Sequence, residues 1–258
     1  MPQKLVLTVL FFTLSLFAGQ SPYRAADSSD WLLLGGSAVV GGAAHVLGTR
    51  MHPLSPAEIA ALDAHSINRW DRPAVENASE RARRWSDFGL HSSLLLPAFL
   101  VADERMRDHG RTLALMYLQT MTAVGAVTEL AKVSFKRVRP YAYAVGPTSR
   151  LPIDARKSFF SGHTSASFAG AVFFAKVYSD FNPDSRWTPA VWAASLALAS
   201  SVAYWRVAAG KHFPSDVMVG ALVGSAVGYG IPALHKRGAD TNLTATASPM
   251  MINVSLCF

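Results

Sequence analysis

Residues 157–165, with the sequence KSFFSGHTS, open a long apolar segment that continues to about Val177. Ser158 or Ser161 could cap a helix here, and Gly162 lets backbone N–H groups approach a ligand closely. The first turn of a helix also offers unpaired N–H donors and the positive end of the helix dipole. The stretch therefore predicts a helix whose N-terminus holds an anion.

Two further clusters of polar residues lie at the ends of apolar stretches, one on each side of this segment. With His163 they supply three cations, two histidines and one carboxylate: Lys132, Arg139, His163, Arg206, His212 and Asp216. Cationic side chains bind the oxygens of a phosphate, one histidine can attack phosphorus, and the other can protonate the leaving oxygen. This inventory indicates phosphoryl transfer.

Asp216 follows His212 by four residues. In a helical turn this spacing lets the carboxylate reach the imidazole. Asp216 would then hold the tautomer of His212 and stabilise its charged form.

The three clusters resemble the signature of the type-2 phosphatidic acid phosphatase superfamily, which includes bacterial class A acid phosphatases and vanadium haloperoxidases. The family pattern is K-x6-R-P, then P-S-G-H, then S-R-x5-H-x3-D. All three motifs occur in this order within roughly residues 85–235. Phe160 replaces the proline and Trp205 replaces the serine, and the family assigns proton chemistry to neither position. The set of reacting residues is therefore complete, and the departures concern the shape of the pocket and the stiffness of its loops.

The resemblance implies an all-α fold, a six-helix bundle of the phosphatase and haloperoxidase kind. It implies that His212 is the nucleophile that forms a phosphohistidine, oriented by Asp216, and that His163 is the general acid. It also implies a set of phosphate-binding residues, namely Lys132, Arg139, Ser161, Gly162 and Arg206. Phosphate hydrolysis in this family needs no metal, so we expect neither a metal nor a cofactor.

Composition narrows the partners. Half of the 258 residues are hydrophobic and 16% are charged, which leaves a membrane location open. A formal net charge of +7 favours anionic partners. We expect a phosphorylated lipid or a small phosphate ester as substrate, a membrane surface as partner, and no nucleic acid. The single cysteine, Cys257, excludes an intramolecular disulfide.

The chain divides into four parts. Residues 1–20 have a basic residue, a short apolar run over 5–17 and then small residues, which predicts a signal peptide, with an uncleaved anchor as the alternative. We expect an N-terminal helix and surface helices in residues 21–88, the phosphatase core in 89–236, and a tail in 237–258. The tail is interpreted as a docked strand or a disordered end.

Within these parts, turn and cap residues predict the main helices. Residues 31–49 form a packed helix or a membrane span, and Ser55 followed by Pro56 begins a short helix. A short apolar segment covers 89–102, and a long helix covers 112–135, with Lys132 near its end and Pro140 as its terminator. Later helices begin at Pro189 and Pro214. In the last one a glycine stripe allows close packing, at Gly220, Gly224 and Gly228.

Glu129 lies on the same predicted helical face as Lys132, three residues before it. We interpret this pair as a simple ion pair, with a role for Glu129 in aiming the lysine as the alternative. Tyr141 and Tyr143 are candidate substrate contacts in the loop that follows.

The environment of the six apolar segments stays open. If a signal delivered residue 20 outside and every later segment crossed a membrane, Lys132 and His163 would lie in the cytoplasm, whereas membrane members of the family are expected to keep these motifs outside. This argument favours a soluble or peripheral domain in the periplasm, although three segments are hydrophobic enough to span. We therefore expect an exported protein, periplasmic and either soluble or membrane-associated.

The leading hypothesis is a metal-independent phosphatase that hydrolyses phosphate monoesters or diphosphates of membrane lipids. A soluble, non-specific periplasmic acid phosphatase and a vanadium-dependent haloperoxidase are the rival enzymes. A headgroup-binding module without turnover is disfavoured, because binding alone needs the cations and not an acid and a nucleophile.

Overall fold

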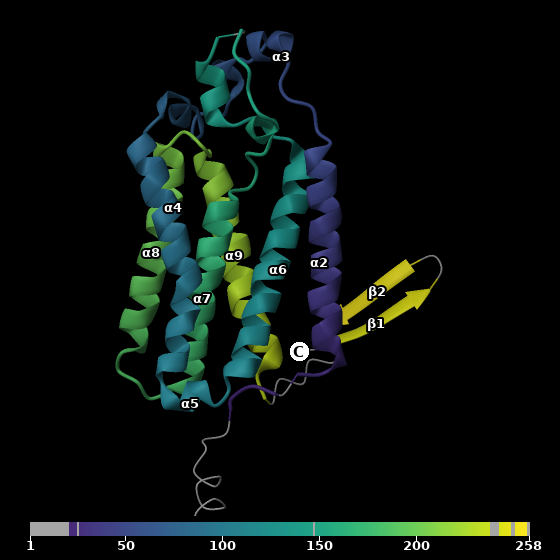
Figure 1. Cartoon of the computed structure of the whole chain (residues 1–258), viewed down its shortest axis with the longest axis vertical. Coiled ribbons are helices and arrows are strands. Elements are labelled where there is room, and N and C mark those ends of the chain that lie inside the picture. Colours follow the sequence, from purple (N-terminus) through teal and green to yellow (C-terminus); the bar gives the residue numbers. More distant parts are fainter. Residues whose placement is uncertain (1–20, 25, 147, 238–242, 249–250, 257–258) are drawn as a thin grey trace, which may run out of the picture.

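The computed structural model describes residues 21–24, 26–146, 148–237, 243–248 and 251–256. The expected signal peptide in residues 1–20 lies outside this part of the chain. Within the described residues, six long helices run up and down along one axis (Figure 1): α2 (Ser28–Thr49), α4 (Glu80–Leu95), α6 (Gly110–Phe135), α7 (Gly162–Phe181), α8 (Thr188–Ala208) and α9 (Pro214–His235). The predicted all-α, six-helix architecture is confirmed.

Short helices cover the two ends of the bundle. Figure 1 shows the segments that contain α3 (Pro56–Ala60), η1 (Ala64–Ser66), η2 (Arg72–Glu76), η4 (Pro140–Ala144) and η5 (Ile153–Arg156) gathered at one end. At the other end lie η3 (Leu96–Ala102) and α5 (Glu104–Arg107). In the tail, β1 (Leu243–Ser248) and β2 (Met251–Leu256) pair antiparallel, with Leu243 opposite Leu256. Two strands that pair with each other thus stand where the sequence predicted a docked strand or a disordered end.

Local cap chemistry explains where most helices begin. Ser55 accepts a hydrogen bond from the N–H of Glu58, and Pro56 is the first residue of α3, as predicted. Ser161 caps α7 by accepting from the N–H of Thr164. Pro214 is the first residue of α9. These starts place residues of two sequence motifs in first turns of helices.

One expected boundary is wrong, and a second boundary is right but has a different cause from the one expected. The apolar segment expected over 89–102 is preceded by a polar helical stretch, because α4 already begins at Glu80 behind the cap Ser79. The long helix α6 ends at Phe135 because Lys136 adopts a left-handed conformation with φ of 46°. Pro140 therefore does not terminate α6; it begins η4 instead.

Helix α7 lies at the centre of the bundle and packs against α4, α6, α8 and α9. Its contact with α9 runs along the predicted glycine stripe. A Cβ on Gly220, Gly224 or Gly228 would lie 2.8, 2.2 or 2.5 Å from a backbone oxygen of α7 or its cap. Glycine is therefore required for this approach of two backbones, which fixes the start of α9 against the start of α7.

A buried polar cluster ties the chain together at the end of the bundle that carries α5. Asp30 accepts two hydrogen bonds from Arg24, at 2.9 and 3.0 Å, and its Oδ1 lies 2.8 Å from Nε2 of His235. At the same end of the bundle, the carboxylate of Asp180 accepts hydrogen bonds from the hydroxyl of Tyr23 and from Nζ of Lys236, each at 2.8 Å. The segment before α2 is thus fastened to the ends of α7 and α9.

The outer surface of the bundle is apolar. In the described part of the chain, three segments are long and apolar enough to cross a membrane: Ser28–Thr49, Gly110–Ala144 and Pro214–His235. Large apolar side chains are exposed on helices around the bundle, among them Leu32, Phe88, Leu118, Tyr204, Met218 and Leu222. Such a surface is costly in water and favourable in lipid. The membrane-associated alternative is therefore favoured over the soluble one.

Candidate active site

The direction of the helices brings the three sequence motifs to one end of the bundle. Since α6 and α8 run toward the end that carries α3, their last turns lie there, and α7 and α9 begin there. Lys132 and Arg206 occupy those last turns, while Ser161 and Asp216 lie at the two starts. Segments far apart in the sequence thus form a single site.

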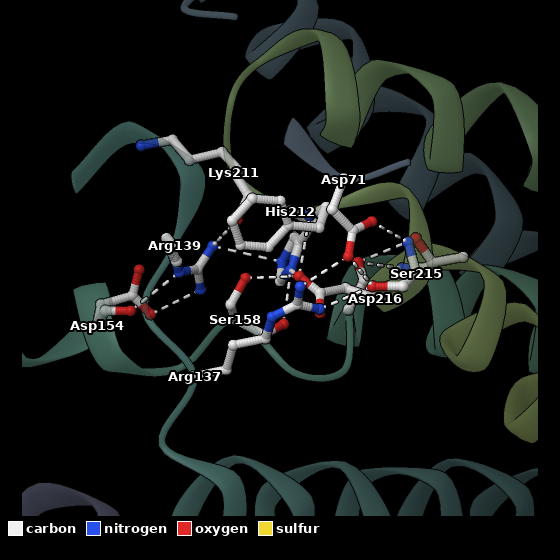
Figure 2. A network of polar contacts seen from close by, with 12 residues as sticks. Asp71, Arg137, Arg139, Asp154, Ser158, Lys211, His212, Ser215 and Asp216 are labelled. Carbon is white, nitrogen blue, oxygen red and sulfur yellow. Dashed lines mark hydrogen bonds and ion pairs between the residues drawn. The ribbon is translucent and has the colours of Figure 1, made fainter. Parts of the chain in front are cut away.

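His212 lies at the centre of this site and its side chain is 2% exposed. Its Nδ1 is 2.8 Å from the carbonyl oxygen of Ser158, which can only accept, so we assign the proton to Nδ1. Its Nε2 is 3.3 Å from Nη1 of Arg139, a group that can only donate. Nε2 therefore carries a free lone pair directed toward the arginine (Figure 2).

The charge state of His212 agrees with this tautomer. Burial lowers the pKa of the imidazole well below its ordinary value, and the positive charges of Arg139, Arg206 and Lys132 lower it further. His212 is therefore neutral at neutral pH, which is the form a nucleophile needs.

Asp216 does not contact His212 in the way its spacing predicts. Its Oδ2 is 3.7 Å from Nδ1 of His212, which is beyond hydrogen-bond distance. The reason is that His212 precedes the first residue of α9, so the two residues do not share a regular helical turn. Oδ2 instead accepts from the hydroxyl of Ser158 at 2.6 Å and from the N–H of Phe213 at 2.9 Å. Asp216 thus fixes the position of Ser158, whose carbonyl oxygen binds the imidazole of His212.

Two further charged residues, Arg137 and Asp71, help to hold Asp216 in position. Arg137 donates to Oδ1 of Asp216 at 2.6 Å and to Asp71 at 2.7 Å (Figure 2). Asp71 is fully buried and also accepts from the N–H and the hydroxyl of Ser215, at 2.9 and 2.6 Å. Sequence reasoning missed both Arg137 and Asp71, because Arg137 occupies an unspecified position of the first motif and Asp71 lies far from every motif in the sequence.

Arg139 is fixed by partners on three sides. Its Nε donates to the carbonyl oxygen of Asp154 and its Nη2 to the carboxylate of the same residue, both at 2.9 Å. Its Nη1 donates to the carbonyl oxygen of Lys211 at 3.1 Å as well as facing His212. These bonds aim a buried guanidinium at the nucleophile (Figure 2).

Lys132 lies over the start of α7. A Cβ on Gly162 would be 3.3 Å from its Nζ, so the glycine allows the lysine to approach closely. Nζ also pairs with Glu129 at 2.8 Å, which confirms the predicted ion pair. The hydroxyl of Ser161 accepts from the hydroxyl of Thr164 at 2.9 Å, which leaves its own proton available for a ligand.

Arg206 is buried and incompletely bonded. Its Nη1 is 3.4 Å from the hydroxyl of Ser86 and 3.8 Å from Asp87. Among the described residues, no group accepts a hydrogen bond from its Nε. Its guanidinium is a cation at neutral pH. A buried cationic donor without a partner fits an anionic ligand.

His163 faces a carboxylate that the sequence did not suggest. Its Nε2 is 3.0 Å from Oδ1 of Asp87, which α4 contributes to the site. Burial and the charges of Arg206 and Arg139 disfavour the protonated form of His163, whereas the carboxylate of Asp87 favours it. The signal for Asp87 was absent because the first half of α4 reads as a polar surface helix.

The structure thus brings together all eight candidate residues. Arg139 contacts Nε2 of His212, and Arg206 and Lys132 lie near enough for their charges to act on the ring. The N-terminus of α7 adds Ser161 and Gly162, and together these groups suit a tetrahedral oxyanion. The two candidate tyrosines flank this site without joining its network. The centre of the Tyr141 ring lies 4.6 Å from Nζ of Lys211, and the ring of Tyr143 packs edge-on against that of Phe213.

Comparison with known proteins agrees with this arrangement. Residues 113–239 match the model of the PAP2 superfamily. The chain is 38% identical over 97 residues to "Probable diacylglycerol pyrophosphate phosphatase 1" of Schizosaccharomyces pombe, covering 34% of this chain and 35% of that protein. It is 32% identical over 108 residues to "Lipid A 1-phosphatase" of Porphyromonas gingivalis, covering 42% of this chain and 20% of that protein.

The chain therefore spans about a third and a fifth of the length of these two relatives. No solved structure matches it. Asp71 and Asp87 both lie outside the residues that match the superfamily.

Proposed function

Because residues 113–239 match the model of the PAP2 superfamily, we propose that this chain is a phosphatase that hydrolyses phosphate monoesters or diphosphates of membrane lipids through a phosphohistidine at His212. One observation carries the proposal: the unprotonated Nε2 of a buried, neutral His212 faces Arg139. The names of the two relatives supply the lipid substrate class.

The first step transfers the phosphoryl group to the enzyme. Lys132, Arg139 and Arg206 bind the phosphate oxygens, and Nε2 of His212 attacks phosphorus in line with the leaving oxygen. A P–N bond forms while the P–O bond to the leaving group breaks. The leaving oxygen takes a proton from His163 and departs as an alcohol or a phosphate monoester.

The second step returns the enzyme to its starting state. Neutral His163 accepts a proton from water as the water oxygen attacks phosphorus, and the P–N bond breaks to release inorganic phosphate. During both steps the N–H at Nδ1 of His212 remains bonded to the carbonyl oxygen of Ser158, while the carboxylate of Asp216 stabilises the charge of the phosphorylated ring. No step in this scheme calls on a metal or cofactor.

The apolar bundle suits a location in the membrane. We propose that its helices cross a bilayer and that the site lies at the membrane surface, where a headgroup can enter while the acyl chains stay in lipid. We further propose that this surface faces the periplasm. Since the segment before α2 is bonded to the last residues of α9, at the opposite end of the bundle from the site, this arrangement places that segment in the cytoplasm. The apolar run in residues 5–17 would then not act as a signal that carries this segment across the membrane.

The proposal is tested by phosphate release from the purified full chain in the presence of a chelator. A phosphorylated lipid in detergent micelles is compared with a soluble aryl phosphate, using His212→Ala as the inactive variant. His65→Ala is the matched control, because the side chain of His65 is exposed and, within the described residues, makes no hydrogen bond to a motif residue. We expect preference for the lipid, and loss of turnover in His212→Ala alone.

Each rival has its own outcome. Full turnover in His212→Ala would contradict the phosphohistidine mechanism. Equal or better use of the aryl phosphate would favour a non-specific acid phosphatase. Halogenation that appears with added vanadate would favour a haloperoxidase, and tight phosphate binding without release would favour a binding module.

A further inference from the structure

Helix α4 brings a carboxylate into a site that is otherwise built from cations. Among the described residues, Asp87 is the one carboxylate that contacts His163. It lies outside the residues that match the superfamily, and no sequence motif includes it. We propose that Asp87 is a positioning residue that orients His163 and, together with a bound phosphate dianion, favours the protonated form that acts as the general acid. This inference rests on the proposed phosphatase function.

The geometry gives Asp87 a defined aim. Its Oδ1 lies 3.0 Å from Nε2 of His163 and 3.8 Å from Nη1 of Arg206, and its Oδ2 lies 3.4 Å from Nη1 of Arg83. Two arginines thus hold the carboxylate from either side. A single carboxylate therefore links the candidate acid to a candidate phosphate ligand.

The helix that carries Asp87 is itself fixed. A Cβ on Gly89 would lie 2.8 Å from the side chain of Val202, so α4 packs closely on α8. On the other side, a Cβ on Gly170 of α7 would lie 2.7 Å from the carbonyl oxygen of Ser93. Because α4 touches both helices within two turns of Asp87, the backbone that carries the carboxylate is held in place relative to His163.

Electrostatics explains why the site needs this group. The cations that bind phosphate also disfavour a charged imidazole, and burial acts in the same direction. The charged groups around His163 are Arg206 from α8, Arg139 from the loop before η4, Lys132 from α6 and Asp87 from α4. Of these, Asp87 alone is negative. It weakens phosphate binding by repulsion, and in return it favours the protonated acid that the leaving group requires.

The contact with Asp87 also gives the two ring nitrogens of His163 different roles. Nε2 keeps its proton in the bond to Asp87, so Nδ1 is the nitrogen left to serve the substrate. In the first step Nδ1 gives its proton to the leaving oxygen. The neutral ring that remains, still protonated at Nε2, can take a proton from water at Nδ1 in the second step.

The test compares two substrates that differ in their need for an acid. An alkyl phosphate has a poor leaving group and depends on protonation, whereas 4-nitrophenyl phosphate leaves as a stable anion. We expect Asp87→Asn to lower kcat/KM for the alkyl phosphate by roughly 10- to 100-fold and to affect the nitrophenyl ester much less. The loss of activity at high pH should begin about one pH unit lower, because removal of the negative charge lowers the pKa of His163.

Two matched variants separate charge from structure. Asp87→Glu retains the carboxylate and should recover most of the alkyl phosphatase activity. Glu80→Gln makes the same change of charge on the same helix, where Glu80 contacts Arg83 and not His163, and should behave as the parent chain. An equal loss on both substrates with an unshifted pH profile would mean that Asp87 only supports the fold, and would overturn the inference.

A readout without turnover makes the two proposals distinguishable. Histidine side-chain NMR signals of the full chain are followed against pH with inorganic phosphate present, and the signal of His163 is identified by its absence in His163→Asn. A lower pKa of His163 in Asp87→Asn supports the inference, and an unchanged titration overturns it. If the parent chain releases no phosphate from any substrate, the proposed function fails, while this titration still decides whether Asp87 controls the proton of His163.

Discussion

At the scale of single residues, different groups fix the tautomer of His212 and supply a negative charge beside it. The spacing of His212 and Asp216 in the sequence assigns both tasks to Asp216. A backbone carbonyl, that of Ser158, fixes the tautomer of the nucleophile. Asp216 fixes Ser158 and adds a negative charge 3.7 Å from the ring. The carboxylate is therefore important for charge and for loop position, but it is not the group that keeps the proton on Nδ1.

This separation predicts a moderate effect for Asp216→Asn. The substitution removes the charge that stabilises the phosphorylated ring but leaves the carbonyl of Ser158 in place, so we expect kcat to fall by roughly 10- to 100-fold. A carboxylate that sets the tautomer directly is worth about 10⁴-fold. Steady-state kinetics of Asp216→Asn beside His212→Ala would measure the difference. Equal inactivity of the two variants, with folding intact, would show that the carboxylate does set the tautomer.

At the scale of elements, the start of α9 depends on how closely that helix packs on α7. The N–H of Ser161 donates to the carbonyl oxygen of Asp216 at 3.1 Å, so the two helix starts are bonded to each other. The glycine stripe below them sets the distance between the axes. Packing several turns away thus controls the position of the nucleophile relative to its phosphate ligands.

Gly224→Ala should therefore be harmful. Its Cβ would lie 2.2 Å from the carbonyl oxygen of Ser165, and backbone cannot rotate away as a side chain can. We expect a loss of about 1–3 kcal/mol in the free energy of unfolding, read as a lower melting temperature in detergent. Gly230→Ala is the matched control, because no atom lies within 4 Å of its Cβ and alanine favours the helix. An equal response of the two variants would contradict the packing argument.

The elements were largely predictable from sequence, and the site only in part. Pro56, Pro214 and the serine at 161 mark helix starts through local chemistry, which sequence displays directly. The start of α4 was missed because its first turns are polar and arginine-rich, as surface helices are. Asp71 and Asp87 were missed because only the folded bundle brings them to the motifs.

At the scale of the whole molecule, the bundle has two chemically different ends. The motifs and the segments with α3 and η5 lie at one end, and the buried cluster around Asp30 closes the other. The apolar surface lies between them. A bilayer around that surface would separate the site from residue 21.

Cysteine labelling tests this arrangement. In a Cys257→Ser background, Thr148→Cys puts a thiol on the end that carries the site, and Asp184→Cys puts one on the opposite end; both positions are exposed. In spheroplasts of an expressing bacterium, we expect an impermeant maleimide to label Thr148→Cys, and to label Asp184→Cys only after the membrane is opened. The reverse pattern would mean a cytoplasmic site, and labelling of both would mean that the bundle does not cross the membrane.

The unpartnered Nε of Arg206 has a consequence for the working cycle. A buried donor that awaits an anion does not distinguish a lipid phosphate from the free phosphate that the reaction produces. The product should therefore linger and compete with the next lipid, and turnover should slow where phosphate is plentiful. An enzyme with this feature would hydrolyse its lipid substrate fastest where free phosphate is scarce, because free phosphate would inhibit the reaction that releases it.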